Sequence, residues 1–397
     1  MSSIASDTGF RTGMDVLLSE HCDCLAGARI GFVSHRAAVN WTGVSSAERL
    51  QAMPGIHLAA LFGPEHGFAG SAPAGETTQD ILHPSWRIPI YSLYGETRAP
   101  TATMLDKVDL LIIEFQDLAA RPYTYVSTLR LVLEAAASHN KPVIVADRPI
   151  PHPIHTDGPI LDPAFSSFVG LIPAPMHYAL TPAETASWLR DTLRLPLDLR
   201  VMPMHHYHRE LTRQPDWPHW VPPSPRIHSW DSACLFTTTV FGEALPALDY
   251  GSGTELAFQV IAAPWLDARA LIKHLNQFPI AGLTPISCRY RAASGLYADQ
   301  VLDGIRLTIS DHARFRPVSA SVLLLEHIQK LVGSERIWSA PDTRPDWFDK
   351  LYGTNRVRLA LLSGHTGLEI INAWEPDLTA FELERSRHLL YHDHLST

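Results

Sequence analysis

Several signals that would assign a sequence quickly to a functional class are scarce or missing in this chain of 397 residues. It has only four cysteines and no CxxC pair of the kind that binds zinc or carries redox chemistry, so we expect free thiols. Lys and Arg nowhere form a run, and 41 acidic residues against 32 basic ones give a formal charge of −9. This balance argues against DNA or RNA as partners.

Targeting and cofactor motifs are missing as well. The opening residues, MSSIASDTGFRTGMDVLL, lack the charged, apolar and small-residue regions of a secretory signal, and no apolar run approaches the ~20 residues that span a bilayer. We therefore expect a cytoplasmic protein without membrane segments. The patterns GxGxxG, GxxxxGK[ST] and GxSxG do not occur, so we expect no nucleotide or other cofactor and no serine nucleophile.

What is present is the composition of a globular protein, with 46% hydrophobic and 18% charged residues and a length that suggests two domains. Up to residue 147, short β-branched runs alternate with helical patterns, which is typical of a parallel sheet built from βαβ units. The pattern predicts an α/β fold with a Rossmann-like parallel-sheet domain over residues 12–228. Its expected strands are 29–34, 57–62, 88–93, 109–115 and 142–147, and its expected helices are 45–53, 101–108, 126–140 and 181–193.

The composition changes in the last third of this domain. Fifteen of the 31 prolines lie between Pro149 and Pro225, which predicts an irregular, rigid segment over the surface. Thr181 and Glu184 have capping-box spacing and predict a helix start within it. Residues 220–227 indicate a boundary. A smaller α+β domain is expected over 229–397, with strands at 255–263 and 304–310 and helices at 267–278, 319–331 and 376–391.

Ionisable and hydrogen-bonding side chains follow nearly every predicted strand. Parallel strands open their carboxyl ends onto one edge of the sheet, where α/β proteins bind ligands. Titratable groups gathered at such an edge shift one another's pKa values, which is a recurrent property of active sites. Polar loops are common, but the number of such groups here favours a functional site. The candidate residues are His35, Arg36, Glu65, His66, Glu96, Gln116, Asp117, Arg121, Tyr123, Tyr125, Asp147 and Arg148.

The strongest single candidate is Glu65, in the stretch LFGPEHGFAG that spans residues 61–70. A buried strand ends here in a turn stiffened by Pro64 and flanked by Gly63 and Gly67. A carboxyl group held against apolar walls has its pKa raised, so it can donate a proton near neutral pH. The alternative is a solvated turn carboxylate that accepts hydrogen bonds from nearby backbone N–H groups.

The segment EFQDLAARPYTYVSTL forms a second dense cluster, with Asp117 and Arg121 just beyond the predicted strand 109–115. Tyrosines that bind hydroxyl groups, and an arginine that binds a carboxylate through two parallel hydrogen bonds, suit a polyhydroxylated ligand with an anionic group. A structural ion pair between Asp117 and Arg121 is the alternative. His206 and His208, in MHHYH, could hold a metal ion as in a metal-dependent hydrolase, but no third ligand is near in sequence, so we expect no metal site.

Seven stretches of the chain match, in the same order, the motifs of one known family. They are GMDVLL, LFGPEHGFAG, IPIYSLYGETRAPT, QDLAARPYTYVSTL, DRPIP, SSFVGLIPAPMHYALTPAE and WVPPSP. The chain resembles the exo-β-N-acetylmuramidases of the NamZ type, the DUF1343 family. The resemblance implies a Rossmann-like N-terminal domain, a smaller α+β C-terminal domain, and release of N-acetylmuramic acid from the non-reducing ends of peptidoglycan fragments. It also implies that Glu65 is the catalytic acid.

The resemblance extends to the second cluster. The arginine in this cluster suits the substrate that the resemblance implies, because muramic acid carries a lactyl carboxylate that an arginine can clamp. Most glycosidases pair their acid with a second carboxylate, for which we favour Asp117 over Asp147 and Glu96. The 2-acetamido group of the substrate is an alternative nucleophile. The family's QD, R and YTY residues fall on Gln116, Asp117, Arg121, Tyr123 and Tyr125.

The chain also departs from the family pattern. The motif SEGRGT appears here as DYGSGT, so Tyr250 and Ser252 stand where a glutamate and an arginine are usual, and Ile150 replaces a polar residue in DRPNP. Glu255 is a candidate for compensating this loss. The departures keep open a preference for another glycan, or a non-catalytic amino-sugar-binding or regulatory protein of the same fold.

Overall fold

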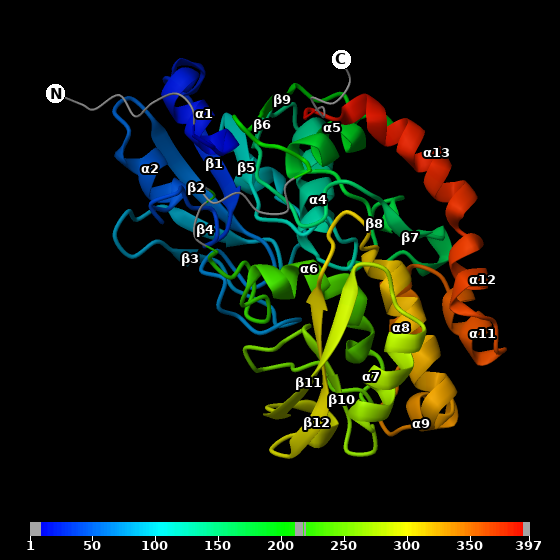
Figure 1. Ribbon diagram of the computed structural model, residues 1–397. Helices are drawn as coiled ribbons and strands as arrows, with labels where there is room; N and C mark the ends of the chain where they lie inside the picture. The colour runs from blue at the N-terminus through cyan, green and yellow to red at the C-terminus, as the bar shows by residue number, and fades with distance from the viewer. Residues whose placement is uncertain (1–8, 211–216, 218–219, 392–397) are drawn as a thin grey trace.

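The computed structural model describes residues 9–210, 217 and 220–391. Its N-terminal half is built on a seven-stranded sheet of order β3-β4-β2-β1-β5-β6-β9, in which only the pair β3–β4 is antiparallel (Figure 1). All five predicted strands are present, whereas β3 and β9 were not predicted. The strands are β1 (Arg29–Ser34), β2 (His57–Gly63), β3 (Ile81–Leu82), β4 (Pro89–Ser92), β5 (Leu110–Glu114), β6 (Val143–Ala146) and β9 (Leu199–Met202).

Helices cover both faces of this sheet. On one face, α1 (Gly13–Glu20) and α2 (Ser46–Ala52) bury apolar side chains against β1, β2 and β5. On the other face lie α4 (Tyr125–Ser138) and α5 (Pro182–Thr192), with the short α3 (Ala102–Leu105) between β4 and β5 in the chain. β5 and β6 are buried along their whole length, as parallel strands covered on both faces are. The Rossmann-like prediction is therefore confirmed.

Much of the proline-rich segment is buried, and the prediction that it runs over the surface is wrong. It contains the antiparallel strands β7 (Asp157–Ile160) and β8 (Pro175–His177), which contact the C-terminal helix α8. Ile150 and Ile172 are fully buried. Local sequence shows the prolines but not the C-terminal helices that cover them. The predicted capping box of Thr181 at the start of α5 is present.

The C-terminal half has a three-stranded antiparallel sheet of order β10-β12-β11 with helices around it. The strand predicted at 255–263 is reduced to its last part, because residues 255–259 form turns, and the helix predicted at 376–391 ends at Arg385. β11 was not predicted. The elements are α6 (Trp230–Thr239), β10 (Val260–Ala262), α7 (Ala268–Gln277), β11 (Leu283–Arg291), β12 (Val301–Ile309), α8 (Pro317–Val332), α9 (Glu335–Trp338), α10 (Pro345–Tyr352), α11 (Arg356–Leu362), α12 (Gly367–Asn372) and α13 (Glu375–Arg385).

The two halves share one hydrophobic core, and α13 runs back along the N-terminal half to reach α5 (Figure 1). There the Trp188 ring meets Phe381 edge-on at 5.5 Å, and its indole N–H donates to Glu384 at 2.8 Å. Just after α13, the hydroxyl of Tyr391 donates to Asp147 at 2.5 Å. These contacts fix the C-terminal half against the sheet that carries the predicted site.

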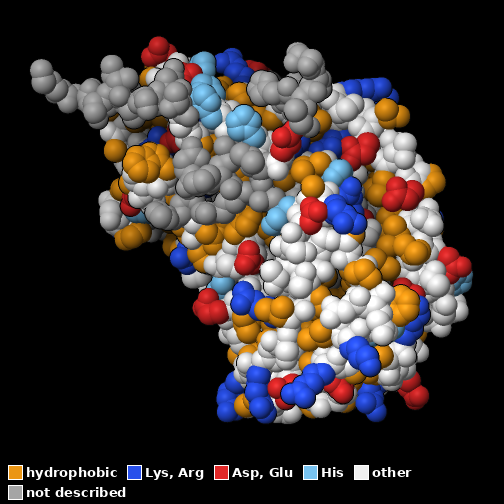
Figure 2. All heavy atoms as spheres, in the orientation of Figure 1, with side chains coloured by type: hydrophobic (Ala, Val, Ile, Leu, Met, Phe, Trp, Pro, Cys, Tyr) orange, Lys and Arg blue, Asp and Glu red, His pale blue; other side chains and the backbone are white. Residues whose placement is uncertain are grey.

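The surface carries charges of both signs. In Figure 2, basic and acidic side chains are mixed over the β11–β12 end of the C-terminal sheet, where Arg289 lies 3.5 Å from Asp303. The four cysteines all belong to the described residues and are free thiols, as expected. Within the described part of the chain, no helix combines the length and the apolar character that a bilayer crossing needs.

Candidate active site

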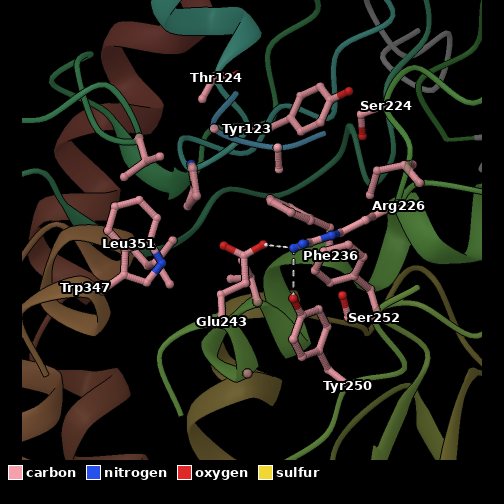
Figure 3. Close-up of a pocket in the computed structure, with 18 of the residues that line it drawn as sticks. Tyr123, Thr124, Ser224, Arg226, Phe236, Glu243, Tyr250, Ser252, Trp347 and Leu351 are labelled. Carbon is pink, nitrogen blue, oxygen red and sulfur yellow. Dashed lines mark hydrogen bonds and ion pairs between the residues drawn. The ribbon is translucent and has the colours of Figure 1, made fainter. Parts of the chain in front are cut away.

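A cavity of about 730 Å³ lies between the carboxyl end of the N-terminal sheet and the C-terminal half (Figure 3). Its volume falls in the range of roughly 300–1,000 Å³ that is usual for small-molecule sites. Aromatic and charged side chains from both halves form its walls. The N-terminal half contributes Glu65, His66, Tyr94, Tyr123 and Thr124, and later parts of the chain contribute Arg226, Glu243, Tyr250, Ser252, Trp347 and Leu351.

Glu65 reaches the cavity because β2 ends in a very tight turn. Gly63 has no room for a side chain, since a Cβ there would lie 2.3 Å from the backbone nitrogen of Phe68. The Glu65 carboxyl is buried, and donors hold both of its oxygens: the N–H of Gly75 at 2.7 Å on Oε1 and the hydroxyl of Thr124 at 2.6 Å on Oε2. This is an oriented carboxyl group at a cavity wall and not the solvated turn carboxylate of the alternative interpretation.

His66 lies beside it in the left-handed backbone region, with φ of 72°. Its Nδ1 is 2.7 Å from the carbonyl oxygen of Ala72, which can only accept, so Nδ1 carries the proton. Burial lowers the pKa of His66, which favours the neutral imidazole. The remaining nitrogen, Nε2, is then an acceptor suited to a ligand hydroxyl group.

The opposite wall carries an arginine, a glutamate and a tyrosine in contact. Nη1 of Arg226 donates to the hydroxyl of Tyr250 at 3.1 Å and lies 3.5 Å from Oε1 of Glu243 (Figure 3). Burial raises the pKa of Glu243, Arg226 opposes this rise, and the charge of Glu65 adds to it. The charge of Glu65 therefore reaches Glu243, which lines the same cavity.

The predicted pair Asp117 and Arg121 lies outside the cavity lining. Asp117 is buried and accepts from the hydroxyl of Tyr178 at 2.5 Å, and burial raises its pKa to about 6. Arg121 is fully buried and donates to three backbone carbonyls, those of residues 159 (3.0 Å), 174 (2.6 Å) and 352 (2.5 Å). Neither the predicted carboxylate clamp nor the alternative ion pair agrees with this arrangement.

Most of the other predicted residues are also held in internal contacts or point to solvent. Asp147 accepts from the hydroxyls of Thr181 and Tyr391, and Arg148 forms a buried ion pair of 2.7 Å with Glu114. Arg36 and Glu96 are exposed. The expectation that all strand ends face one hollow is therefore wrong, because the β7–β8 segment and C-terminal helices cover the ends of β5 and β6. The predicted residues outside the cavity lining are His35, Arg36, Glu96, Gln116, Asp117, Arg121, Tyr125, Asp147 and Arg148.

The cavity includes residues that sequence reasoning did not single out. Arg226 and Glu243 carried no local signal, since they join Glu65 only through the packing of the two halves. Tyr250 and Ser252 were noted only as departures from a family motif. Among the described residues, no group of three or more His, Cys, Asp or Glu side chains is arranged to hold a metal ion.

Comparison with known families decides the relationship. The family model described as "Exo-beta-N-acetylmuramidase NamZ, N-terminal" matches residues 30–231, and its C-terminal counterpart matches residues 234–391. The chain belongs to the NamZ family. The peptidoglycan beta-N-acetylmuramidase NamZ of Bacillus subtilis is 33% identical over 386 residues, which cover 96% of this chain and 91% of that protein.

Two crystal structures of DUF1343 family proteins from Bacteroides fragilis have the same fold as this NamZ-family chain. The first has a TM-score of 0.90 and 28% identity, covering 97% of this chain and 100% of the other. The second has a TM-score of 0.75 and 24% identity, covering 97% and 99%. The family and the fold implied by the sequence motifs are thus confirmed.

Proposed function

We propose that this NamZ-family protein is an exo-acting glycoside hydrolase that releases N-acetylmuramic acid from the non-reducing ends of peptidoglycan fragments. The observation that carries the proposal is the oriented carboxyl of Glu65 at the wall of a cavity of about 730 Å³. The kinship with a peptidoglycan beta-N-acetylmuramidase supports the choice of substrate.

In this proposal Glu65 protonates the glycosidic oxygen while the bond from that oxygen to the anomeric carbon breaks. The leaving sugar departs with a free hydroxyl group, and water finally supplies the oxygen on the anomeric carbon. The N–H of Gly75 can only donate, so it fixes Oε1 as an acceptor. The hydroxyl of Thr124 can donate or accept, so Oε2 can carry the proton without losing this partner.

We assign the role of the second carboxylate to Glu243 instead of Asp117. Glu243 lines the cavity with Glu65, whereas Asp117, Asp147 and Glu96 do not. A carboxylate at this wall could activate the water or orient the 2-acetamido group of the substrate as an internal nucleophile. The anomer that forms first, identified by proton NMR, separates an inverting mechanism from the two retaining mechanisms. The retaining mechanisms use either an enzyme carboxylate or the 2-acetamido group as the nucleophile.

The test uses p-nitrophenyl β-glycosides of N-acetylmuramic acid and of N-acetylglucosamine. We expect the wild type to hydrolyse the muramide, and Glu65→Gln to lose roughly 10²–10⁴-fold in rate, because the amide cannot donate the acidic proton. Glu96→Gln makes the same chemical change on an exposed loop outside the cavity and should keep the wild-type rate, as should treatment with EDTA. A Glu65→Gln variant at the wild-type rate would exclude the assigned role.

A non-catalytic amino-sugar-binding protein is the second candidate, favoured by Tyr250 and Ser252 at the positions of a family glutamate and arginine. It predicts calorimetric binding of N-acetylmuramic acid by the wild type without release of nitrophenol. Turnover of the muramide that depends on Glu65 rules it out.

We also propose two domains, 12–228 and 229–397, with the catalytic acid on the first. Because Glu243 and Tyr250 line the cavity, the second domain contributes to the site and is more than an auxiliary module. The four free thiols support a place in the cytoplasm, since disulfides persist mainly in oxidising compartments.

A further inference from the structure

Arg226 presents an open guanidinium edge to the cavity. Its side chain keeps 40% of its surface exposed although it lies in the cavity wall. Nη1 is engaged by Tyr250 and Glu243. Within the described residues, Nε and Nη2 have no protein partner. These two N–H groups form the side of a guanidinium that binds a carboxylate through two parallel hydrogen bonds.

The surroundings of Arg226 hold the guanidinium in place. The Tyr250 ring packs directly over Gly242, where a Cβ would lie 2.4 Å from Cδ1 of the ring. A side chain at position 242 would therefore displace the tyrosine, and with it the hydroxyl that accepts from Nη1. The carboxyl of Glu243 lies 3.5 Å from the same nitrogen. An arginine fixed through one nitrogen loses less side-chain entropy when its other nitrogens bind a ligand.

Other cations near the cavity are less suited to this task. Arg344 donates to the carbonyl of Glu243 and its guanidinium lies 5.4 Å from the Trp347 ring centre. Arg121, the clamp expected from the sequence, donates to three backbone carbonyls and does not reach the cavity. Lys350 lines the cavity but carries a compact ammonium group without the planar fork.

We propose that Arg226 is the specificity-determining residue for an acidic sugar, and that its Nε and Nη2 bind the lactyl carboxylate of the substrate's terminal residue. The inference rests on the proposed function and names how its substrate is recognised. Ser252, where the family motif has an arginine, lines the same cavity, so Arg226 supplies a guanidinium that position 252 lacks. Tyr250 acts as a positioning residue through Arg226.

The experiment compares Arg226→Met and Arg226→Lys with the matched control Lys350→Met, which removes one positive charge from the same cavity. The substrates are the p-nitrophenyl β-glycosides of N-acetylmuramic acid, of its lactyl carboxamide and of N-acetylglucosamine. We expect Arg226→Met to lower kcat/KM for the muramide roughly 10- to 100-fold, mostly through KM, because a charged hydrogen-bonded pair is lost. Loss of the contact between Arg226 and Glu243 affects all three substrates alike, so the ratios of the muramide rate to the carboxamide and glucosaminide rates isolate the lactyl contact. These ratios should fall roughly 10-fold or more, and circular dichroism reports correct folding.

Arg226→Lys should recover only part of the loss, and Lys350→Met should leave the ratio of muramide to glucosaminide rates unchanged. Tyr250→Phe should raise KM for the muramide severalfold without changing kcat. An unchanged ratio in Arg226→Met overturns the inference while the hydrolase proposal stands. Equal losses in Arg226→Met and Lys350→Met also overturn it, because they indicate a diffuse charge effect.

A binding arm keeps the inference testable if no substrate is cleaved, an outcome that would overturn the hydrolase proposal alone. Calorimetry with free N-acetylmuramic acid should give a Kd at least tenfold tighter for the wild type than for Arg226→Met. N-acetylglucosamine should bind both proteins equally. Equal affinity of the two proteins for N-acetylmuramic acid overturns the assignment of Arg226.

Discussion

Replacing Arg121 by leucine separates a structural role from a ligand-binding one. The sequence suggested that this arginine clamps an anionic sugar, yet its guanidinium is fully buried and donates to the carbonyls of residues 159, 174 and 352. Two of these carbonyls belong to the β7–β8 region and the third lies at the end of α10. Arg121 therefore connects the N-terminal half to the C-terminal helices, and we expect its loss to reduce stability first.

The magnitude follows from the three acceptors. A buried carbonyl without a partner costs about 1–3 kcal/mol, and the carbonyl of residue 174 keeps the N–H of Leu161 at 3.2 Å, so the two carbonyls of residues 159 and 352 set a range of about 2–6 kcal/mol. Burial also lowers the pKa of Arg121 to about 9, which reflects a desolvation penalty of a few kcal/mol that leucine does not carry. We therefore expect Arg121→Leu to lower the free energy of unfolding by about 2–4 kcal/mol.

Urea unfolding followed by circular dichroism measures this loss, with Arg190→Leu as the control. Arg190 lies on the partly exposed side of α5, and among the residues that the structure describes its side chain pairs with its neighbour Asp191 alone, so its variant should change stability by about 0.5 kcal/mol or less. At temperatures where Arg121→Leu remains folded, its KM for the muramide should match the wild type. If Arg121→Leu has wild-type stability and a tenfold higher KM, Arg121 binds the ligand and has no structural role.

Two further predictions concern the same interior. Gly353→Ala should destabilise the protein by about 1–3 kcal/mol in urea unfolding, because φ there is 71° and a Cβ would lie 2.2 Å from Nη2 of Arg121; an unchanged midpoint would contradict the packing. His177 is neutral when folded, since burial lowers its pKa to about 4, whereas the unfolded chain binds the proton near pH 6.5. The contribution of neutral His177 to stability is therefore present above pH 6.5 and is lost as the pH falls toward 4. His177→Gln should weaken the acid destabilisation of the protein over this window by up to about 1.4 kcal/mol per pH unit. Identical pH profiles of the wild type and the variant would refute this prediction.

Strands and helices whose signal is local were predictable from the sequence. β1, β2 and β5 are apolar runs, and such runs are buried wherever helices cover both faces of a parallel sheet. The start of α5 was predictable because Thr181 and Glu184 satisfy the first backbone N–H groups by themselves. These features need no knowledge of the rest of the chain.

β11 was missed for the opposite reason. Its residues, Leu283–Arg291, are mostly exposed or half-buried and include a proline and two arginines, so neither alternation nor hydrophobicity marks a strand. It exists because β12 offers it a full antiparallel ladder, with pairs from Leu283 with Ile309 to Arg291 with Val301. A strand that depends on its partner for stability leaves little trace in its own sequence.

The residues of the candidate site also fall into two groups, those with a local sequence signal and those whose position depends on distant segments. Glu65 was predictable because the turn that aims it lies within a few residues of it in the chain. Arg121 was misread because its fate depends on distant segments: its backbone N–H donates to Met176 at 2.8 Å, and its side chain reaches the carbonyl of Tyr352 at 2.5 Å. A polar residue at a strand end indicates an edge of the sheet, but not whether the rest of the chain covers that edge.

The polar residues that line the cavity differ from the buried polar residues outside it in how many of their hydrogen-bonding atoms already have a partner. Arg121 uses both terminal nitrogens and Asp147 both carboxyl oxygens for internal partners, so a ligand could bind these atoms only by breaking buried contacts. His66 and Arg226 each use part of their capacity to fix their own position and leave the rest at the cavity, which is the arrangement that recognises a ligand without reorganisation. Glu65 belongs with this second group only because the hydroxyl of Thr124 can reverse its role when the carboxyl gains a proton. A polar side chain at the end of a strand thus becomes a candidate for catalysis when its internal partners orient it and still allow its protonation state to change.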